Sequence, residues 1–155
     1  KELADKWPTE LAVKEQLETL TYESTKKTRG LIRALFATLE YRKSPDMEIA
    51  IKWRKIHIDH VHPKKHPDES IRKEFSECVH YLGNLVLLHG QSNSKLKDAD
   101  PIDKIQTYKK CNLNITNEVG ELIKKNGAWK VGHVAERTKE ITAALLQALE
   151  QPKQS

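Results

Sequence analysis

The stretch Ile56-His57-Ile58-Asp59-His60-Val61-His62-Pro63 decides the fold of this chain. β-branched apolar residues alternate with polar ones along it, which is typical of a β-strand, and a proline ends the run. A second run, Asn84-Leu85-Val86-Leu87-Leu88, follows the turn at Gly83 and predicts a second strand. The centre of the chain is therefore expected to form a two-stranded β-unit.

Apolar residues recur at helical spacing on both sides of this unit. Because an isolated pair of strands is marginally stable in water, these helices must pack on it. The pattern predicts a mostly helical α+β fold, in which several helices flank one two-stranded antiparallel hairpin. The expected helices cover residues 9–22, 26–42 (capped by Ser24 or Thr25), 67–82, 93–96, 101–110, 116–125 and 134–150.

Composition narrows the class of protein. The chain has 155 residues, of which 37% are hydrophobic, enough for one compact domain with a real core. Its 27 basic and 22 acidic residues give a net charge of +5, which permits a polyanionic partner. No apolar run approaches the roughly 20 residues that span a bilayer, so we expect no membrane partner. Two cysteines, Cys78 and Cys111, exclude a disulfide scaffold and favour a cytoplasmic setting.

Histidine is concentrated in one short segment. The window 51–66 holds five Lys or Arg residues and a single acid, Asp59. That acid has two explanations: an ion pair with Arg54 or Lys55, or a ligand for a hard cation such as Mg²⁺. The four clustered histidines are His57, His60, His62 and His66.

Two asparagines bracket the second apolar run. Taken alone, Asn84 is most simply a turn residue beside Gly83, and Asn93 is a helix N-cap. Their separation of nine residues acquires a meaning only when it is combined with the Asp59-His60 pair.

The combination of Asp59-His60-Val61-His62-Pro63, Asn84-Leu85 and Asn93 resembles the HNH (His-Me finger, ββα-metal) nucleases. Their pattern is Asp-His-Ile-x-Pro, then Asn-Leu-x-x-Leu, then His or Asn nine residues after the first Asn. More narrowly, the chain resembles the C-terminal HNH domain of GmrSD-type modification-dependent restriction enzymes and related phage-defence nucleases. The supporting pieces are Leu39-Glu40, Leu82-Gly83-Asn84-Leu85-Val86-Leu87-Leu88, Asn93-Ser94-Lys95-Leu96, Lys104 and Tyr108.

The resemblance implies a ββα-metal core and a role for each matching residue. His60 would be the general base, and Asp59 and Asn93 would hold one Mg²⁺ or Mn²⁺. Asn84 would hydrogen-bond the loop after the first strand and so orient His60. Expected contacts to DNA phosphates are Lys64, Lys65, Lys95 and Lys104.

Three points qualify this assignment. Many HNH proteins bind a structural zinc through CxxC pairs, but His89 and Ser92 occupy those positions here, so no structural zinc is expected. Successive residues of a regular strand face opposite sides, so Asp59 and His60 reach one site only if the strand ends or twists there. His57 and His62 have three open interpretations: surface residues, phosphate contacts or spare ligands. The expected structural or solvent-facing histidines are His66, His80, His89 and His133, and Arg137 is a candidate phosphate contact.

We therefore expect one HNH nuclease domain over residues 1–155, with a motif core at about 56–96 and helical flanks at 9–43 and 101–150. It would form the C-terminal part of a longer protein whose N-terminal NTP-dependent or modification-sensing domain selects the target. The predicted function is a metal-dependent DNA endonuclease that nicks DNA and restricts phage or foreign DNA. One alternative is a catalytically inactive DNA-binding module. A purely structural helical domain would leave the histidine cluster unexplained.

Overall fold

The computed structural model describes residues 8–22, 25–44, 55–90, 96 and 98–149. Over these residues the chain is mostly helical, with one two-stranded antiparallel sheet, and this confirms the predicted fold class. The elements are α1 (Glu10–Glu18), α2 (Lys26–Lys43), β1 (Ile56–His60), α3 (Glu69–Phe75), the short 3₁₀ turn η3 (Leu82–Asn84), β2 (Leu85–His89), α5 (Pro101–Lys110), α6 (Asn114–Asn126) and α7 (Val131–Leu149).

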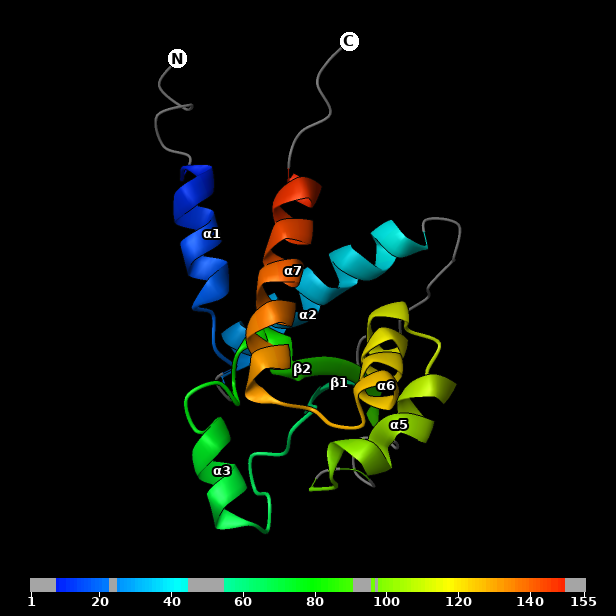
Figure 1. Ribbon diagram of the computed structural model, residues 1–155. Helices are drawn as coiled ribbons and strands as arrows, with labels where there is room; N and C mark the ends of the chain where they lie inside the picture. Colours follow the sequence, from blue (N-terminus) through cyan, green and yellow to red (C-terminus); the bar gives the residue numbers. More distant parts are fainter. Residues whose placement is uncertain (1–7, 23–24, 45–54, 91–95, 97, 150–155) are drawn as a thin grey trace, which may run out of the picture.

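The two strands lie at the centre of the molecule (Figure 1). α1 and α7 stand side by side above them, whereas α3 and α5 lie below on opposite sides. α6 packs against α5 and β2, and the start of α7 contacts η3. The hairpin is thus enclosed by helices, as its own marginal stability requires.

The strand register places the Asp-His pair at one end of the sheet. His60, the last residue of β1, pairs with Leu85, and Ile56 pairs with His89. The four apolar residues Leu85–Leu88 of β2 are all almost completely buried. This strand is therefore covered on both faces, which explains its continuous apolar run.

Side chains cap most helix starts. Thr25 caps α2, which decides between the two candidates for that position, and Asp68 and Asp100 cap α3 and α5. α6 is different because Leu113 precedes it and has no capping side chain. The fully buried carboxylate of Glu40 replaces the cap and accepts hydrogen bonds from backbone nitrogens of α6; they come from Asn114 (2.6 Å) and Ile115 (3.1 Å).

Two predicted helices are too long. α1 ends at Glu18 rather than at residue 22, because Tyr22 donates its backbone N–H to the carbonyl of His80 at 2.8 Å. α3 ends at Phe75 rather than at 82, and the carbonyl of Val79 accepts a hydrogen bond from the Asn84 side chain instead. In the first case a hydrogen bond to a distant segment replaces the helical one, and in the second a side chain five residues along the chain does so.

The first strand is also shorter than predicted. β1 ends at His60, not at His62, since the backbone N–H of His62 bonds the side chain of Asn84. Asn84 itself lies in η3, just before β2 rather than in it. The helix expected at 93–96 falls largely outside the described residues. None of the described helices is long and apolar enough to cross a membrane.

Candidate functional site

The end of β1 presents Asp59 and His60 to different neighbours. The carboxylate of Asp59 contacts α5, and the ring of His60 lies against Tyr22 and His80. This is the alternation expected of a regular strand. The strand does end directly after the pair, but within the described residues the two side chains do not contact each other.

Asp59 is only 5% exposed and is held from α5. Its Oδ2 accepts hydrogen bonds from the ammonium of Lys104 at 3.1 Å and from the hydroxyl of Tyr108 at 3.2 Å. Burial raises the pKa of Asp59, and the Lys104 charge and the hydrogen bonds from Lys104, Tyr108 and the backbone of His60 oppose that rise. The carboxylate is therefore fixed in orientation by one face of α5.

Lys104 is fully buried and does not lie at the surface, where a phosphate contact was expected. Its ammonium also donates to the backbone carbonyl of His60 at 2.6 Å. Burial lowers the pKa of Lys104, and Asp59 opposes this. Because the ammonium is committed to Asp59 and His60, the expectation that Lys104 touches DNA phosphate does not fit this position.

The imidazole of His60 packs edge-on against two rings. The ring centroid of Tyr22 lies 5.4 Å away and that of His80 lies 5.1 Å away. Burial lowers the pKa of His60 to about 3, and the nearby His80, Lys104 and Lys64 add to the effect. The ring is thus neutral at neutral pH and retains a lone pair for a proton, although it is a weaker base than histidine in water.

Asn84 fixes the loop that follows β1. Its Oδ1 accepts from the backbone N–H of His62 at 2.9 Å and from the indole of Trp129 at 3.0 Å. Its Nδ2 donates to the carbonyls of His62 (3.0 Å) and Val79 (2.8 Å). The side chain is fully buried and uses all of its hydrogen-bonding capacity. These contacts match the loop contact implied for Asn84, while its effect on catalysis remains a prediction.

α7 supports the turn that carries Asn84. A Cβ on Gly83 would lie 2.0 Å from the carbonyl oxygen of Val134, so only glycine allows this close approach. Arg137 donates to the carbonyls of Gly83 (2.8 Å) and Leu85 (2.7 Å). It is 8% exposed, and burial lowers its pKa to about 10. Arg137 therefore supports the backbone of this turn, instead of contacting phosphate from the surface.

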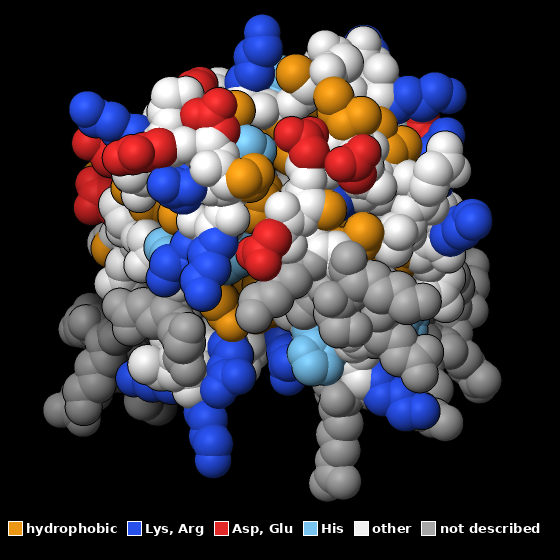
Figure 2. Space-filling view, turned by 90° about the horizontal axis from the view of Figure 1, so that it is seen from below, with side chains coloured by type: hydrophobic (Ala, Val, Ile, Leu, Met, Phe, Trp, Pro, Cys, Tyr) orange, Lys and Arg blue, Asp and Glu red, His pale blue; other side chains and the backbone are white. Residues whose placement is uncertain are grey.

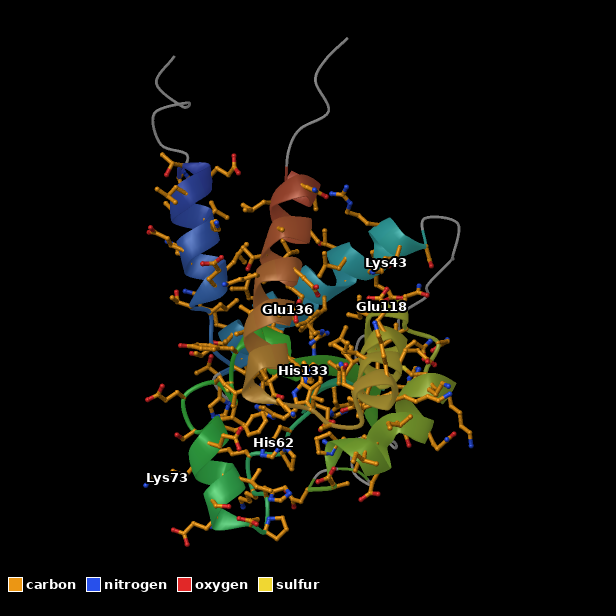
Figure 3. All side chains as sticks on the ribbon, viewed as in Figure 1. Lys43, His62, Lys73, Glu118, His133 and Glu136 are labelled. Carbon is orange, nitrogen blue, oxygen red and sulfur yellow. The ribbon has the colours of Figure 1, made fainter. Side chains whose placement is uncertain are left out.

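His62 lies beneath the hairpin, between α3 and α5 (Figure 3). Its ring stacks on Phe75 with centroids 3.8 Å apart and on His66 at 5.2 Å. Within the described part of the chain, its buried Nε2 has no hydrogen-bond partner. Burial, and secondarily His66, lower its pKa to about 4. His62 thus behaves mainly as a packed, neutral aromatic ring.

The remaining predicted site residues divide into two groups. Asn93 and Lys95 lie outside the described residues, and the residues that are described contain no group of three or more His, Cys, Asp or Glu placed to hold a metal. Lys64 and Lys65 are exposed in the turn after Pro63. On the face seen from below, basic side chains gather beside histidines, while most acidic ones lie in the upper half of that view (Figure 2).

The sequence predicted only a structural or solvent-facing role for His80, and in the structure its ring hydrogen-bonds that of His60. The one sequence feature that could have pointed to His80 is its closeness to the motif segment Leu82-Gly83-Asn84. Tyr108 was noted as part of the resemblance, but its contact with Asp59 depends on how α5 packs. One signal was available: Lys104 and Tyr108 lie four residues apart and so share a face of a helix.

Comparison with known proteins gives the family. Residues 7–144 match the family described as GmrSD restriction endonucleases, C-terminal domain. None of the curated proteins matches the chain. The match spans most of the 155 residues and includes the helices and turns that surround the end of β1. The chain therefore belongs to the family of GmrSD restriction endonuclease C-terminal domains.

Proposed function

We propose that this domain is a metal-dependent DNA endonuclease of the HNH type, which hydrolyses phosphodiester bonds one strand at a time. The observation that carries the proposal is the Asp59-His60 pair at the end of β1, with Asn84 fixing the loop directly behind it. This arrangement occurs in a chain of a restriction endonuclease family.

His60 is the proposed general base. Its ring is neutral at neutral pH because burial and neighbouring positive charge disfavour the protonated form. A neutral imidazole accepts the proton of the attacking water as the new P–O bond forms. The contact of its ring with His80 and the bond of its carbonyl to Lys104 keep the residue in place.

Asp59 and Asn93 are the proposed ligands of one Mg²⁺ or Mn²⁺. A carboxylate and an amide oxygen suit such hard cations. The contacts of Lys104 and Tyr108 both use Oδ2 of Asp59, so neither engages Oδ1. When bound, the cation supplies positive charge that stabilises the phosphate and the leaving oxygen. The donor chemistry at Asp59 therefore fits the ion.

Exposed lysines are the proposed phosphate contacts. The positive charge of Lys64 lowers the pKa of both His60 and His80, which supports a role for this lysine near the proposed base. Lys65 is its exposed neighbour. Lys95 remains proposed from its position two residues after Asn93.

The proposed setting is restriction of phage or other foreign DNA in the cytoplasm. In this scheme an N-terminal NTP-dependent or modification-sensing domain of the same protein selects the target. The domain described here then supplies hydrolysis with little sequence preference of its own.

A supercoiled-plasmid assay tests the proposal. With Mg²⁺ or Mn²⁺ the chain should convert supercoiled DNA to open circles, and EDTA should stop the conversion. His60→Ala should lower the rate about 10²–10⁴-fold, the usual effect of removing a general base. His89→Ala is the matched control, since His89 is an exposed histidine at the end of β2. Gel retardation without metal-dependent cleavage would contradict the proposal and indicate a DNA-binding module.

A further inference from the structure

The rings of His60 and His80 form a hydrogen bond between two elements that are distant in sequence. Nε2 of His60 lies 3.1 Å from Nδ1 of His80, and the ring planes are inclined by 74°. A bond between two neutral imidazoles needs one N–H donor and one lone-pair acceptor. The direction of this bond therefore fixes which nitrogen of each ring carries the proton.

The fold holds His80 on both sides. Its backbone carbonyl accepts the N–H of Tyr22 at 2.8 Å, and Thr21 and Tyr81 form an isolated bridge next to it. On either side of His80, the carbonyl of Val79 accepts from Nδ2 of Asn84, and that of Tyr81 accepts from the Asn84 backbone. His80 is thus fixed by the same turn that carries Asn84.

Only one direction of the bond leaves His60 able to act as a base. Within the described residues, Nε2 of His60 has His80 as its partner, and Nδ1 has no hydrogen-bond partner. If Nε2–H donates, Nδ1 carries the lone pair. If His80 donated instead, Nε2 of His60 would be occupied as an acceptor and the ring proton would sit on Nδ1.

We propose that His80 is a positioning residue, which accepts a hydrogen bond from Nε2–H of His60 and so keeps the lone pair of His60 on Nδ1. This inference rests on the proposed role of His60 as general base. His80 then carries its own proton on Nε2. Tyr22 contacts the ring of His60 edge-on and Lys104 bonds only its carbonyl, so neither can set the tautomer.

The proton balance is simple. One proton of the attacking water moves to Nδ1 of His60 while the water oxygen forms a bond to phosphorus. The leaving oxygen departs with the electron pair of the broken P–O bond. His60 becomes an imidazolium whose Nε2–H still donates to Nδ1 of His80. Because a charged donor forms a stronger hydrogen bond, this contact favours the step without any movement of His80.

Two variants separate this role from simple packing. His80→Phe keeps a ring but removes the acceptor, whereas His80→Asn places an amide oxygen near the position of Nδ1. At saturating DNA and Mn²⁺, His80→Phe should lower kcat about 10- to 100-fold, by analogy with the loss of outer hydrogen-bond partners of metal-binding histidines. KM should change little, and His80→Asn should restore most of kcat. His89→Phe serves as the control.

The tautomer is measured directly by ¹⁵N NMR of histidine-labelled protein without DNA or metal. In the wild-type chain Nε2 of His60 should give the signal of a protonated nitrogen and Nδ1 that of an unprotonated one. In His80→Phe the two forms should mix. A proton on Nδ1 of His60 in the wild-type chain would overturn the proposal, as would equal kcat losses in His80→Phe and His80→Asn.

Failure of the proposed function would look different. If the wild-type chain binds but never cleaves DNA with metal, the nuclease assignment fails, and the inference about catalysis fails with it. The NMR experiment still determines the direction of the His60–His80 bond in that case. A correct tautomer without cleavage would therefore contradict the nuclease assignment, and a wrong tautomer with cleavage would contradict only the role of His80.

Discussion

Lys104 and Asp59 form a buried ion pair, with Nζ of Lys104 3.1 Å from Oδ2 of the carboxylate. Lys104 is fully buried and Asp59 almost so, and the pair joins α5 to the end of β1. The two opposite charges therefore neutralise each other within the pair. If a divalent cation binds Asp59 as proposed, its added charge would be balanced by the phosphate of DNA, so that metal binding and substrate binding would be linked.

Removing one partner of this pair should be costly. In Lys104→Met the carboxylate of Asp59 loses its opposite charge while it stays buried, and such a loss typically destabilises a protein by about 3–5 kcal/mol. We expect the free energy of unfolding, measured by urea denaturation, to fall by an amount of this order. Tyr108 would retain a single hydrogen bond to Asp59.

The double variant Lys104→Met/Asp59→Asn provides the control. It removes both charges and keeps a polar group that can accept from Tyr108, so it should be more stable than Lys104→Met alone. If the single and double variants lose stability equally, the two charges are not coupled, and the loss comes only from altered packing.

Asp59 should dominate metal binding. Asp59→Ala removes the charged ligand, and Asn93→Ala removes a neutral amide, which binds a hard cation less strongly. In calorimetric titration with Mn²⁺, and in the Mn²⁺ dependence of cleavage, Asp59→Ala should therefore show the larger loss. Asp103→Ala is the matched control, because Asp103 is an exposed carboxylate in the first turn of α5. Unchanged Mn²⁺ binding in Asp59→Ala would place the metal site elsewhere.

The sequence predicted most of the fold because the spacing of apolar residues shows which face of a helix or strand is buried. The bounds of α5 were correct to the residue, since Asp100 and Pro101 mark its start and its apolar positions recur at helical spacing. α3 was predicted too long because apolar residues continue beyond Phe75. Those residues are buried in a turn stabilised by Asn84, and local pattern cannot distinguish such a turn from a helix.

The candidate site was predicted as a set of residues but not as a geometry. Spacing alone grouped Asp59, His60 and Asn84. It could not show that Lys104 points inward, because a lysine in a helix is normally solvated; its burial is compensated by the carboxylate of Asp59 and the carbonyl of His60. The contact of His80 with His60 also depends on tertiary packing, since Tyr22 from the segment after α1 holds the backbone of His80.

His62 should make stability depend on pH. Burial lowers its pKa in the folded chain to about 4, below the ordinary value of 6.5; nearby His66 and Lys104 act in the same direction, and Asp100 opposes them. As the pH falls from 6.5 towards 4, the unfolded chain binds a proton that the folded chain does not. The free energy of unfolding is therefore highest above pH 6.5 and falls below it, by at most about 1.4 kcal/mol per pH unit for this group.

His62→Phe tests this dependence. Phenylalanine can still stack on Phe75 and does not titrate, and the backbone bonds to Asn84 remain available. Urea unfolding at several pH values between about 4.5 and 7.5 should give a smaller loss of stability on acidification in the variant than in the wild type. Parallel curves for the two proteins would mean that His62 is not protonated on unfolding in this range.

DNA binding should depend strongly on salt if Lys64 and Lys65 contact phosphates. Both are exposed in the turn after Pro63, and the charge of Lys64 acts on His60 and His80. Each phosphate neutralised on duplex DNA contributes about −0.9 to the slope of log K against log salt. Lys64→Ala should therefore flatten this slope by about one unit, with little change in sequence preference. Lys65→Ala and Lys95→Ala are expected to act in the same way.

Lys125→Ala is the control, because Lys125 is an exposed lysine in the last turn of α6, and it should leave the slope unchanged. If Lys64→Ala and Lys125→Ala give the same slope, the turn after Pro63 does not face the DNA backbone, because a lysine that neutralises no phosphate releases no counterion from DNA.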